Sequence, residues 1–295
     1  MTLTRRSLMT AVAAGTAAAS PGASPALAAT PLSWRVLQGA PTSFGKTSVL
    51  LTGQRDAVLV DGMFTLAEGR MAVEAIRASG KRLTTVFVSH GDPDYYFSLE
   101  VVRAAFPEAR FLATPSTVAH INATMAKKLE TWVPRMGDNA PRSPFVPEAM
   151  TGTTLRLEDE VLELVTPEGA LPDRGYLWSP SLGAMFGGVL AFAGLHAWTA
   201  DTATPASRLA WRRALVAMEA RNPRIVVAGH GVAGAATDAS SLRSTREYLE
   251  VFEAEFAAAA DGAALIAAMK RRYPGLGLEI ALEIGAKVAK GEMNW

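Results

Sequence analysis

Two histidines stand at points where apolar segments give way to polar loops, one in each half of the chain. His90 follows the apolar segment 85–88 and opens the polar loop 89–96, and His230 follows the segment 225–229. Loops at the ends of strands carry a large share of ligands and catalytic groups. Each histidine alone is as compatible with a structural role as with a site. Two strand-end histidines that converge at a sheet edge favour a shared site.

The two remaining histidines have weaker claims. His196 stands two residues before Trp198 and is as compatible with packing in the core as with lining a pocket. His120 falls inside a predicted helix, where we expect a structural role. The chain contains no cysteine, which excludes a thiolate metal site and a disulfide framework.

The elements that must position these side chains come in two similar runs. The first run has strands expected at 34–38, 47–52, 57–61, 85–88 and 110–113, with helices at 66–78, 99–105 and 116–128. The second has short strands between 154 and 186 and at 225–228, with helices at 207–220 and from 242 onward. No Pro- or Ser-rich linker separates the runs. We therefore predict one α+β domain over residues 29–295, with two sheets packed face to face and helices outside.

Composition and the first residues bear on the class of protein and its destination. A formal net charge of +1 over 295 residues predicts no nucleic-acid partner. The pair Arg5-Arg6, the apolar run 9–19 and Ala26-Leu27-Ala28 have the order of a signal peptide, and the paired arginines resemble the twin-arginine type. The apolar run is too short to span a bilayer. We predict a leader over residues 1–28, export to the periplasm or medium, and no membrane span in the mature chain.

At the level of motifs, the chain resembles the metallo-β-lactamase superfamily. Residues 89–97, SHGDPDYYF, are similar to the superfamily's H-x-H-x-D-H loop, and the segments 58–61, 180–183, 194–196 and 226–231 stand at family-like spacing. The resemblance covers nearly the whole chain after the leader. It implies an αββα four-layer sandwich of two similar halves, with a metal site at one sheet edge and hydrolase-like chemistry.

The same resemblance shows where the metal motif is altered. The first histidine and the aspartate of the loop are retained as His90 and Asp94, and the last histidine of the motif is His230. Asp92 replaces the second histidine of the loop, and Tyr95 replaces the third. Asp94 and His230 would remain as ligands of the second metal, with a tyrosine that ligates poorly unless it is ionised.

Two further positions of the motif differ as well. The next histidine of the family falls on Glu168, and the aspartate that bridges two cations falls on Val189. Valine has no lone pair to offer, so a second zinc is not expected. The motif is altered too far for ordinary two-zinc hydrolysis.

The first metal position keeps ligands of a changed type. His90, Asp92 and Glu168 would offer one nitrogen and two carboxylates, a set that can hold one divalent cation. Carboxylates favour harder ions and acidify a bound water less than three histidines do. Crowded carboxylates repel one another, and either a cation or Arg174 folding over the site would relieve that. We expect at most one divalent ion (Zn, Mn or Fe) and no organic cofactor; a decayed site that only hydrogen-bonds is the alternative.

These features are compatible with two classes of function, an enzyme and a binding protein. The enzyme would be an exported hydrolase for an ester, lactone or amide-type small molecule. In it Asp94 would orient or deprotonate a water, His230 would polarise the substrate, and Tyr95 or His196 would donate to the oxyanion. The alternative is a catalytically silent protein that keeps the fold and pocket without metal. A one-metal enzyme of other chemistry, such as an iron oxygenase, is a third reading, and the fold alone does not choose between them.

Aromatic residues predict the character of the pocket. Trp198, Tyr96 and Phe97, together with the segment 132–147, would line it and favour a partly apolar small-molecule ligand. Ordinary packing of aromatic side chains would produce the same pattern.

Overall fold

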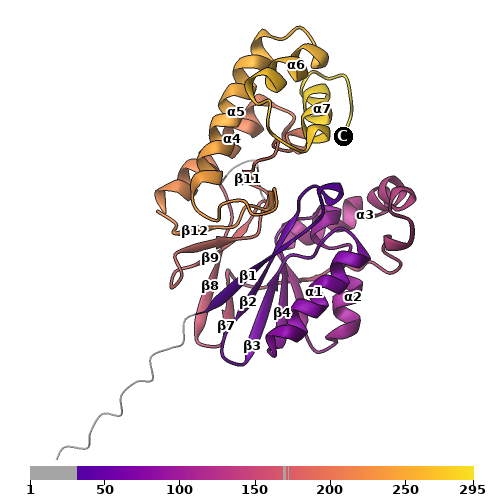
Figure 1. The fold of residues 1–295 in the computed structure, drawn as a ribbon, viewed down its shortest axis with the longest axis vertical. Helices are drawn as coiled ribbons and strands as arrows, with labels where there is room; N and C mark the ends of the chain where they lie inside the picture. The colour runs from indigo at the N-terminus through magenta and orange to yellow at the C-terminus, as the bar shows by residue number, and fades with distance from the viewer. Residues whose placement is uncertain (1–31, 169–170, 172) are drawn as a thin grey trace, which may run out of the picture.

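The computed structural model describes residues 32–168, 171 and 173–295 (Figure 1). The predicted leader and its cleavage site lie outside the described residues. Among the helices of the described part of the chain, none is both long and apolar enough to cross a membrane.

The first half of the chain forms a mixed six-stranded sheet in the order β1-β2-β3-β4-β5-β6. Its strands are β1 (Ser33–Gln38), β2 (Thr47–Thr52), β3 (Asp56–Val60), β4 (Arg82–Val88), β5 (Arg110–Ala113) and β6 (Glu148–Ala149). The first three strands pair antiparallel, and β3 to β6 pair parallel. Parallel neighbours need crossover connections, which are α1 (Leu66–Ser79), α2 (Leu99–Ala105) and α3 (Pro115–Met136).

The second half forms a five-stranded sheet in the order β12-β10-β9-β8-β7. Its strands are β7 (Thr154–Leu157), β8 (Glu160–Val165), β9 (Tyr176–Ser179), β10 (Ala184–Phe186) and β12 (Ile225–Val226). A small parallel pair, β11 (Phe192–Ala193) with β13 (His230–Gly231), lies beside it. The helices of this half are α4 (Pro205–Ala220), α5 (Ser240–Ala258), α6 (Gly262–Arg272) and α7 (Glu279–Ala289), gathered in orange and yellow in Figure 1.

Alternation along the strands explains why the two sheets face each other. In β3, Val58 and Val60 pack in one buried cluster while Ala57 and Leu59 pack in another, as the two-residue period of a strand requires. The cluster that holds Val58 also holds Leu162 and other side chains of the second sheet, so it is the core between the sheets. The other cluster includes the buried faces of α1, α4 and α5. These layers confirm the predicted αββα sandwich.

Helix α3 is longer than the sequence pattern predicts, and the difference matters for the site. The periodicity indicates an end near residue 128, whereas the helix continues to Met136 and contains Pro134 in its last turn. Trp132 is 8% exposed and packs edge-on against Phe44 and Phe64 at centroid distances of 5.3 and 5.6 Å. Burial of this aromatic side chain stabilises the additional turns, since moving an apolar ring out of water is favourable.

Candidate functional site

The loop that carries the site is held at its start by a buried aspartate at the end of β3. Asp61, directly after β3, is fully buried and accepts hydrogen bonds from the backbone N–H of Ser89 at 2.7 Å and from its hydroxyl at 2.8 Å. The Ser89 hydroxyl oxygen in turn accepts from the N–H of Gly188 at 2.7 Å. These contacts join the ends of β3 and β4 to the segment after β10. They fix the direction in which His90 leaves the sheet.

A buried lysine balances the charge of Asp61. Lys46 is fully buried, and its Nζ lies 3.4 Å from Oδ2 of Asp61. The same ammonium lies 4.0 Å from the ring centroid of Tyr95, a cation–π geometry. The sequence contains no local signal for this placement, because Lys46 stands beside an apolar strand far from the loop it supports. A fixed positive charge therefore lies beside the second metal position of the family motif.

His230 and Tyr95 meet at that second position. Nδ1 of His230 lies 3.1 Å from the carbonyl oxygen of Phe44, which can only accept, so Nδ1 carries the proton and Nε2 keeps its lone pair. Burial, followed by the charge of Lys46, lowers the pKa of His230 to about 3, so the ring is neutral. The Tyr95 hydroxyl lies 3.2 Å from Nε2 and 3.1 Å from the carbonyl oxygen of Gly188, to which it donates.

The surroundings of Tyr95 favour its neutral, protonated form. Burial, with the charges of nearby aspartates, raises its pKa well above the ordinary value for tyrosine. The close approach of two backbone segments holds the hydroxyl in place: a Cβ on Gly229 would lie 2.0 Å from the carbonyl oxygen of Gly188, so only glycine fits there. Val189 follows directly, is 2% exposed and lines the cavity beside the site.

Asp94 completes this side of the site with an unpartnered oxygen. Its carboxylate is 5% exposed, and Oδ2 lies 3.5 Å from Nε2 of His230 without making a hydrogen bond. Burial, together with the negative charge of Asp92, raises the pKa of Asp94 to about 7. Asp94 and His230 both line one cavity, so they face the same ligand space.

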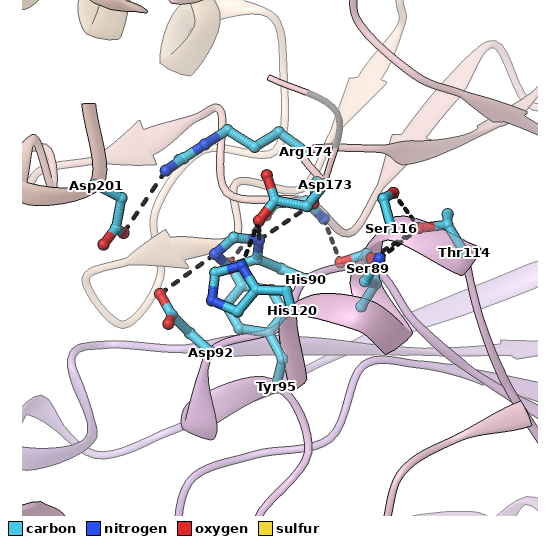
Figure 2. Close-up of polar contacts among 12 residues, drawn as sticks. Ser89, His90, Asp92, Tyr95, Thr114, Ser116, His120, Asp173, Arg174 and Asp201 are labelled. Atoms are coloured by element: carbon cyan, nitrogen blue, oxygen red, sulfur yellow. Dashed lines mark hydrogen bonds and ion pairs between the residues drawn. The ribbon is translucent and has the colours of Figure 1, made fainter. Parts of the chain in front are cut away.

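His90 and Asp92 form the centre of the first position (Figure 2). Nε2 of His90 lies 3.2 Å from Oδ2 of Asp92, and Nδ1 lies 3.2 Å from the carbonyl oxygen of Asp173. Burial works to lower the pKa of His90, but the hydrogen bond and charge of Asp92 outweigh it and the pKa is raised. Lys128 of α3 donates to Oδ1 of Asp92 at 3.0 Å. Burial favours the protonated form of Asp92, yet His90 and Lys128 hold its pKa well below the usual range.

Asp201 brings a second carboxylate to this position. It lies in the 3-10 turn η4 (Ala200–Thr202), and its ligand atom lies within 4.8 Å of ligand atoms of His90 and Asp92. Oδ2 of Asp201 is buried, makes no hydrogen bond and lies 3.6 Å from Nη2 of Arg174. Figure 2 shows the Arg174 guanidinium extended toward Asp201. The arginine that the sequence suggested as a counter-charge is therefore next to a carboxylate of the group.

Glu168 does not lie in this group. Its side chain is exposed, whereas His90, Asp92 and Asp201 are buried or half-buried. The structure therefore brings Asp201, and not Glu168, beside the other two side chains. No local motif marks Asp201 in the sequence: it stands in an irregular segment three residues after Trp198.

The predicted pocket residues separate in the same way. Trp198 lines the cavity that also contains Asp92, Asp94 and His230. His196 is 1% exposed, and its Nδ1 lies 3.1 Å from the hydroxyl of Tyr248 on α5, so it packs against that helix. Tyr96 is 1% exposed and its ring packs against Phe97 at 5.1 Å. Neither His196 nor Tyr96 is among the residues that line this cavity.

His120 and Asp173 form a polar layer behind His90. Nδ1 of His120 lies 2.7 Å from Oδ2 of Asp173, and its ring lies edge-on to the ring of His90 at 5.7 Å. The backbone of Asp173 binds His90, as described above, so this aspartate connects α3 to the site. A group of this kind orients a ligand histidine in metal sites.

The arrangement can be tested for its fit to one cation. His90, Asp92 and Asp201 offer one nitrogen and two carboxylates, the number and type of ligands that suit one divalent ion. The Asp201 oxygen that makes no hydrogen bond has an unmet requirement for a positive partner. Lys128 and Arg174 already meet part of that requirement. The residues therefore fit a single cation, held more weakly than in a site without competing positive side chains.

Comparisons with known proteins agree with this arrangement at the level of the fold. A sequence profile described as the metallo-beta-lactamase superfamily matches residues 42–230. No curated protein matches the chain. Among solved structures, a beta-lactamase domain protein from Burkholderia ambifaria is 19% identical, with a TM-score of 0.62 over 88% of this chain and 84% of that one.

Two further structures are named metallo-β-lactamases. DIM-1 is 18% identical, with a TM-score of 0.52 over 74% of this chain and 92% of its own. A protein from Pontibacter korlensis is 19% identical, with a TM-score of 0.50 over 70% and 87% of the two chains. At these identities the similarity establishes the fold and leaves the reaction open.

Proposed function

Since the chain belongs to the metallo-β-lactamase superfamily, we propose that it is a hydrolase-like enzyme with one atypical divalent-cation site. The observation that carries the proposal is the group His90, Asp92 and Asp201, whose ligand atoms lie within 4.8 Å of one another. This group borders a cavity lined by Asp92, Asp94 and His230. The substrate class is an ester, a lactone or an amide-type small molecule.

Asp94, Tyr95 and His230, which stand at the family's second metal position, would then work without a metal of their own. The charge of Lys46 acts on both Asp94 and His230, and Val189 stands where the resemblance to the family places the bridging carboxylate. A cation at the first position would supply Lewis acidity and acidify a water. The chain's own task is to orient the reacting groups.

Asp94 and His230 are the residues that we assign to proton handling. Asp94 faces the cavity with an oxygen that makes no hydrogen bond, so it can accept a proton from a water beside it. His230 presents an unprotonated Nε2 toward Asp94, because its Nδ1 proton is committed to the carbonyl of Phe44. Tyr95 keeps its proton and donates a hydrogen bond to the carbonyl oxygen of Gly188. The buried rings of Phe64, Trp132 and Phe192 line the cavity beside these groups.

A second candidate function rests on the positive side chains of the site. Lys128 and Arg174 lie beside Asp92 and Asp201, as a cation would. If these two residues satisfy the carboxylates permanently, the chain is a catalytically silent binding protein that keeps the fold and the cavity.

We also propose that the protein is exported, because its first 28 residues have the order of a signal peptide.

Metal content and thermal stability distinguish the two candidates. Protein matured in its own host should contain at most one divalent ion per chain. Added Mn²⁺, Fe²⁺, Zn²⁺ or Mg²⁺ at a hundredfold excess over its dissociation constant should stabilise the fold by about 2.7 kcal/mol, which shifts the melting temperature by roughly 5 °C or more. Protein that carries no metal and responds to none of the four ions would favour the binding protein. Two tightly held zincs per chain would contradict both readings.

A further inference from the structure

Two cavities meet beside the candidate site. The inner cavity contains the carboxylates of Asp92 and Asp94 and has a volume of about 30 Å³. The outer cavity, lined by His120, Lys127 and neighbouring residues, has a volume of about 400 Å³. A water needs roughly 10–15 Å³ of such space, so the inner cavity as it stands has room for about two or three waters. An ester or amide substrate needs more room than this.

Three side chains line both cavities: Lys128, Trp132 and Trp295. The first two belong to α3 and are held by the helix. Trp132 is 8% exposed and packs among aromatic rings, and Lys128 is bound to Asp92. Trp295 belongs to no helix or strand and is 39% exposed. Of these three side chains, that of Trp295 can move away with the least loss of packing.

The Trp295 ring is nevertheless placed by specific contacts. Its Nε1 donates to Oδ1 of Asp201 at 2.7 Å. Its ring lies edge-on to Trp198 at 5.2 Å, and Nζ of Lys128 lies 4.9 Å from the ring centroid. The indole therefore touches one carboxylate of the cation group, one cavity aromatic and the lysine on the other carboxylate. It forms part of the wall that the two cavities share.

We propose that Trp295 is the specificity-determining wall of the site. Its indole limits the inner cavity to small groups, and without the indole the two cavities join into one space that reaches Asp92 and Asp94. Ligands with a flat apolar group suit the joined space, because Phe44, Phe64 and Trp132 line its inner part. The inference rests on the proposed function only in taking the inner cavity as the place where the substrate reacts.

The test measures ligand size selectivity in the absence of metal. Benzyl alcohol and 2-naphthylmethanol are titrated by ligand-detected NMR into the whole chain in buffer with a chelator. Trp295→Ala should bind the naphthyl compound at least tenfold more tightly than the unaltered chain does, with a smaller change for the benzyl compound. Trp295→Phe keeps a ring but loses the Nε1–H, and it should retain the original selectivity. Met293→Ala, which alters the outer cavity alone, is the matched control.

Several results would overturn the proposal. One is a Trp295→Ala variant that binds the naphthyl compound no better than the unaltered chain. Another is a Met293→Ala variant with the same gain. A gain in Trp295→Phe would assign the selectivity to the hydrogen bond with Asp201 and not to the ring. Trp295→Leu, which fills part of the same space, should give an intermediate gain and serves if the alanine variant does not fold. Because no metal is present, failure of the cation proposal leaves this result unaffected.

Discussion

The ammonium of Lys128 lies 3.0 Å from Oδ1 of Asp92, within the group of side chains that would hold a cation. Both side chains are largely buried, at 16% and 14% exposure. A lysine in this place competes with a metal ion for the same carboxylate, and Arg174 does so for Asp201 at 3.6 Å. The affinity of the site for a cation is thus set as much by these positive side chains as by the ligands.

Replacing that lysine should strengthen cation binding. In Lys128→Met, a divalent ion no longer meets a positive charge beside Asp92. We expect roughly tenfold tighter binding, or about 1.4 kcal/mol, which is part of the few kcal/mol by which charges some 4 Å apart repel at moderate dielectric. Calorimetric titration with Mn²⁺ measures it. Lys127→Met, on the exposed neighbouring position, should leave the affinity unchanged; equal effects of the two variants would mean that only net charge matters.

Amide variants of Asp201 and Glu168 can show which of these two carboxylates is the third ligand of the cation. Asp201→Asn keeps an oxygen that can accept from the Trp295 indole but removes the negative charge. We expect it to abolish the rise in melting temperature caused by a divalent ion, since mass-action stabilisation requires binding to the folded state. Glu168→Gln, at an exposed position, should retain that rise. The reverse pattern in thermal melts would restore Glu168 as the third ligand.

Glu158 predicts an acid-dependent contribution to stability away from the site. Its carboxylate accepts the backbone N–H groups of Gln54, Arg55 and Asp56, and these bonds lower its pKa. A lowered pKa stabilises the fold above the unfolded-state value and loses that effect as the pH falls through the folded-state pKa. Glu158→Gln should therefore melt at a lower temperature than the unaltered chain at pH 7.

The pH profile of that variant is the decisive measurement. The difference in melting temperature between Glu158→Gln and the unaltered chain should shrink as the pH falls below about 4, the ordinary range of a glutamate. Asp159→Asn, on the same turn, is the control and should show no such profile. A difference that stays constant from pH 7 to pH 3 would show that the charge of Glu158 contributes nothing.

Export is tested on the leader itself. N-terminal sequencing of protein from the periplasm or medium should find a chain that begins near Ala29. Changing Arg5 and Arg6 to Lys should abolish secretion if the twin-arginine route is used, because that route reads the arginine pair. Secretion at an unchanged level would indicate the general route. Mature protein with an intact Met1 would refute the leader.

Much of the fold is written in local patterns. The apolar run at 57–61 predicts a strand, and the structure places Val58 and Val60 in one core and Ala57 and Leu59 in another. Thr65 and Glu68 form a capping box where the sequence predicts the start of α1, and Gly80 follows its end. Such signals can be recognised in the sequence because the spacing of apolar residues and helix capping each involve only a few neighbouring residues.

Only part of the site can be predicted from the sequence. The sequence predicts a site that includes the loop with His90, Asp92 and Asp94 and the distant His230, and its resemblance to the family implies that Val189 replaces the bridging carboxylate. The position of Asp201 beside His90 and Asp92, and the exposure of Glu168, become visible only in the folded chain. The reason is that Asp201 lies in an irregular turn whose position depends on the packing of the second half of the chain. No periodic sequence pattern predicts that position.

The charges and the cavity were likewise decided by tertiary structure. Lys46, Lys128 and Arg174 come from separate segments, and each is placed by the burial of its neighbours rather than by a motif. Trp295 reaches Asp201 from the far end of the sequence. Ligand type follows from the identity of a residue, whereas the balance of charge and the size of a cavity follow from which distant side chains the folded chain brings together.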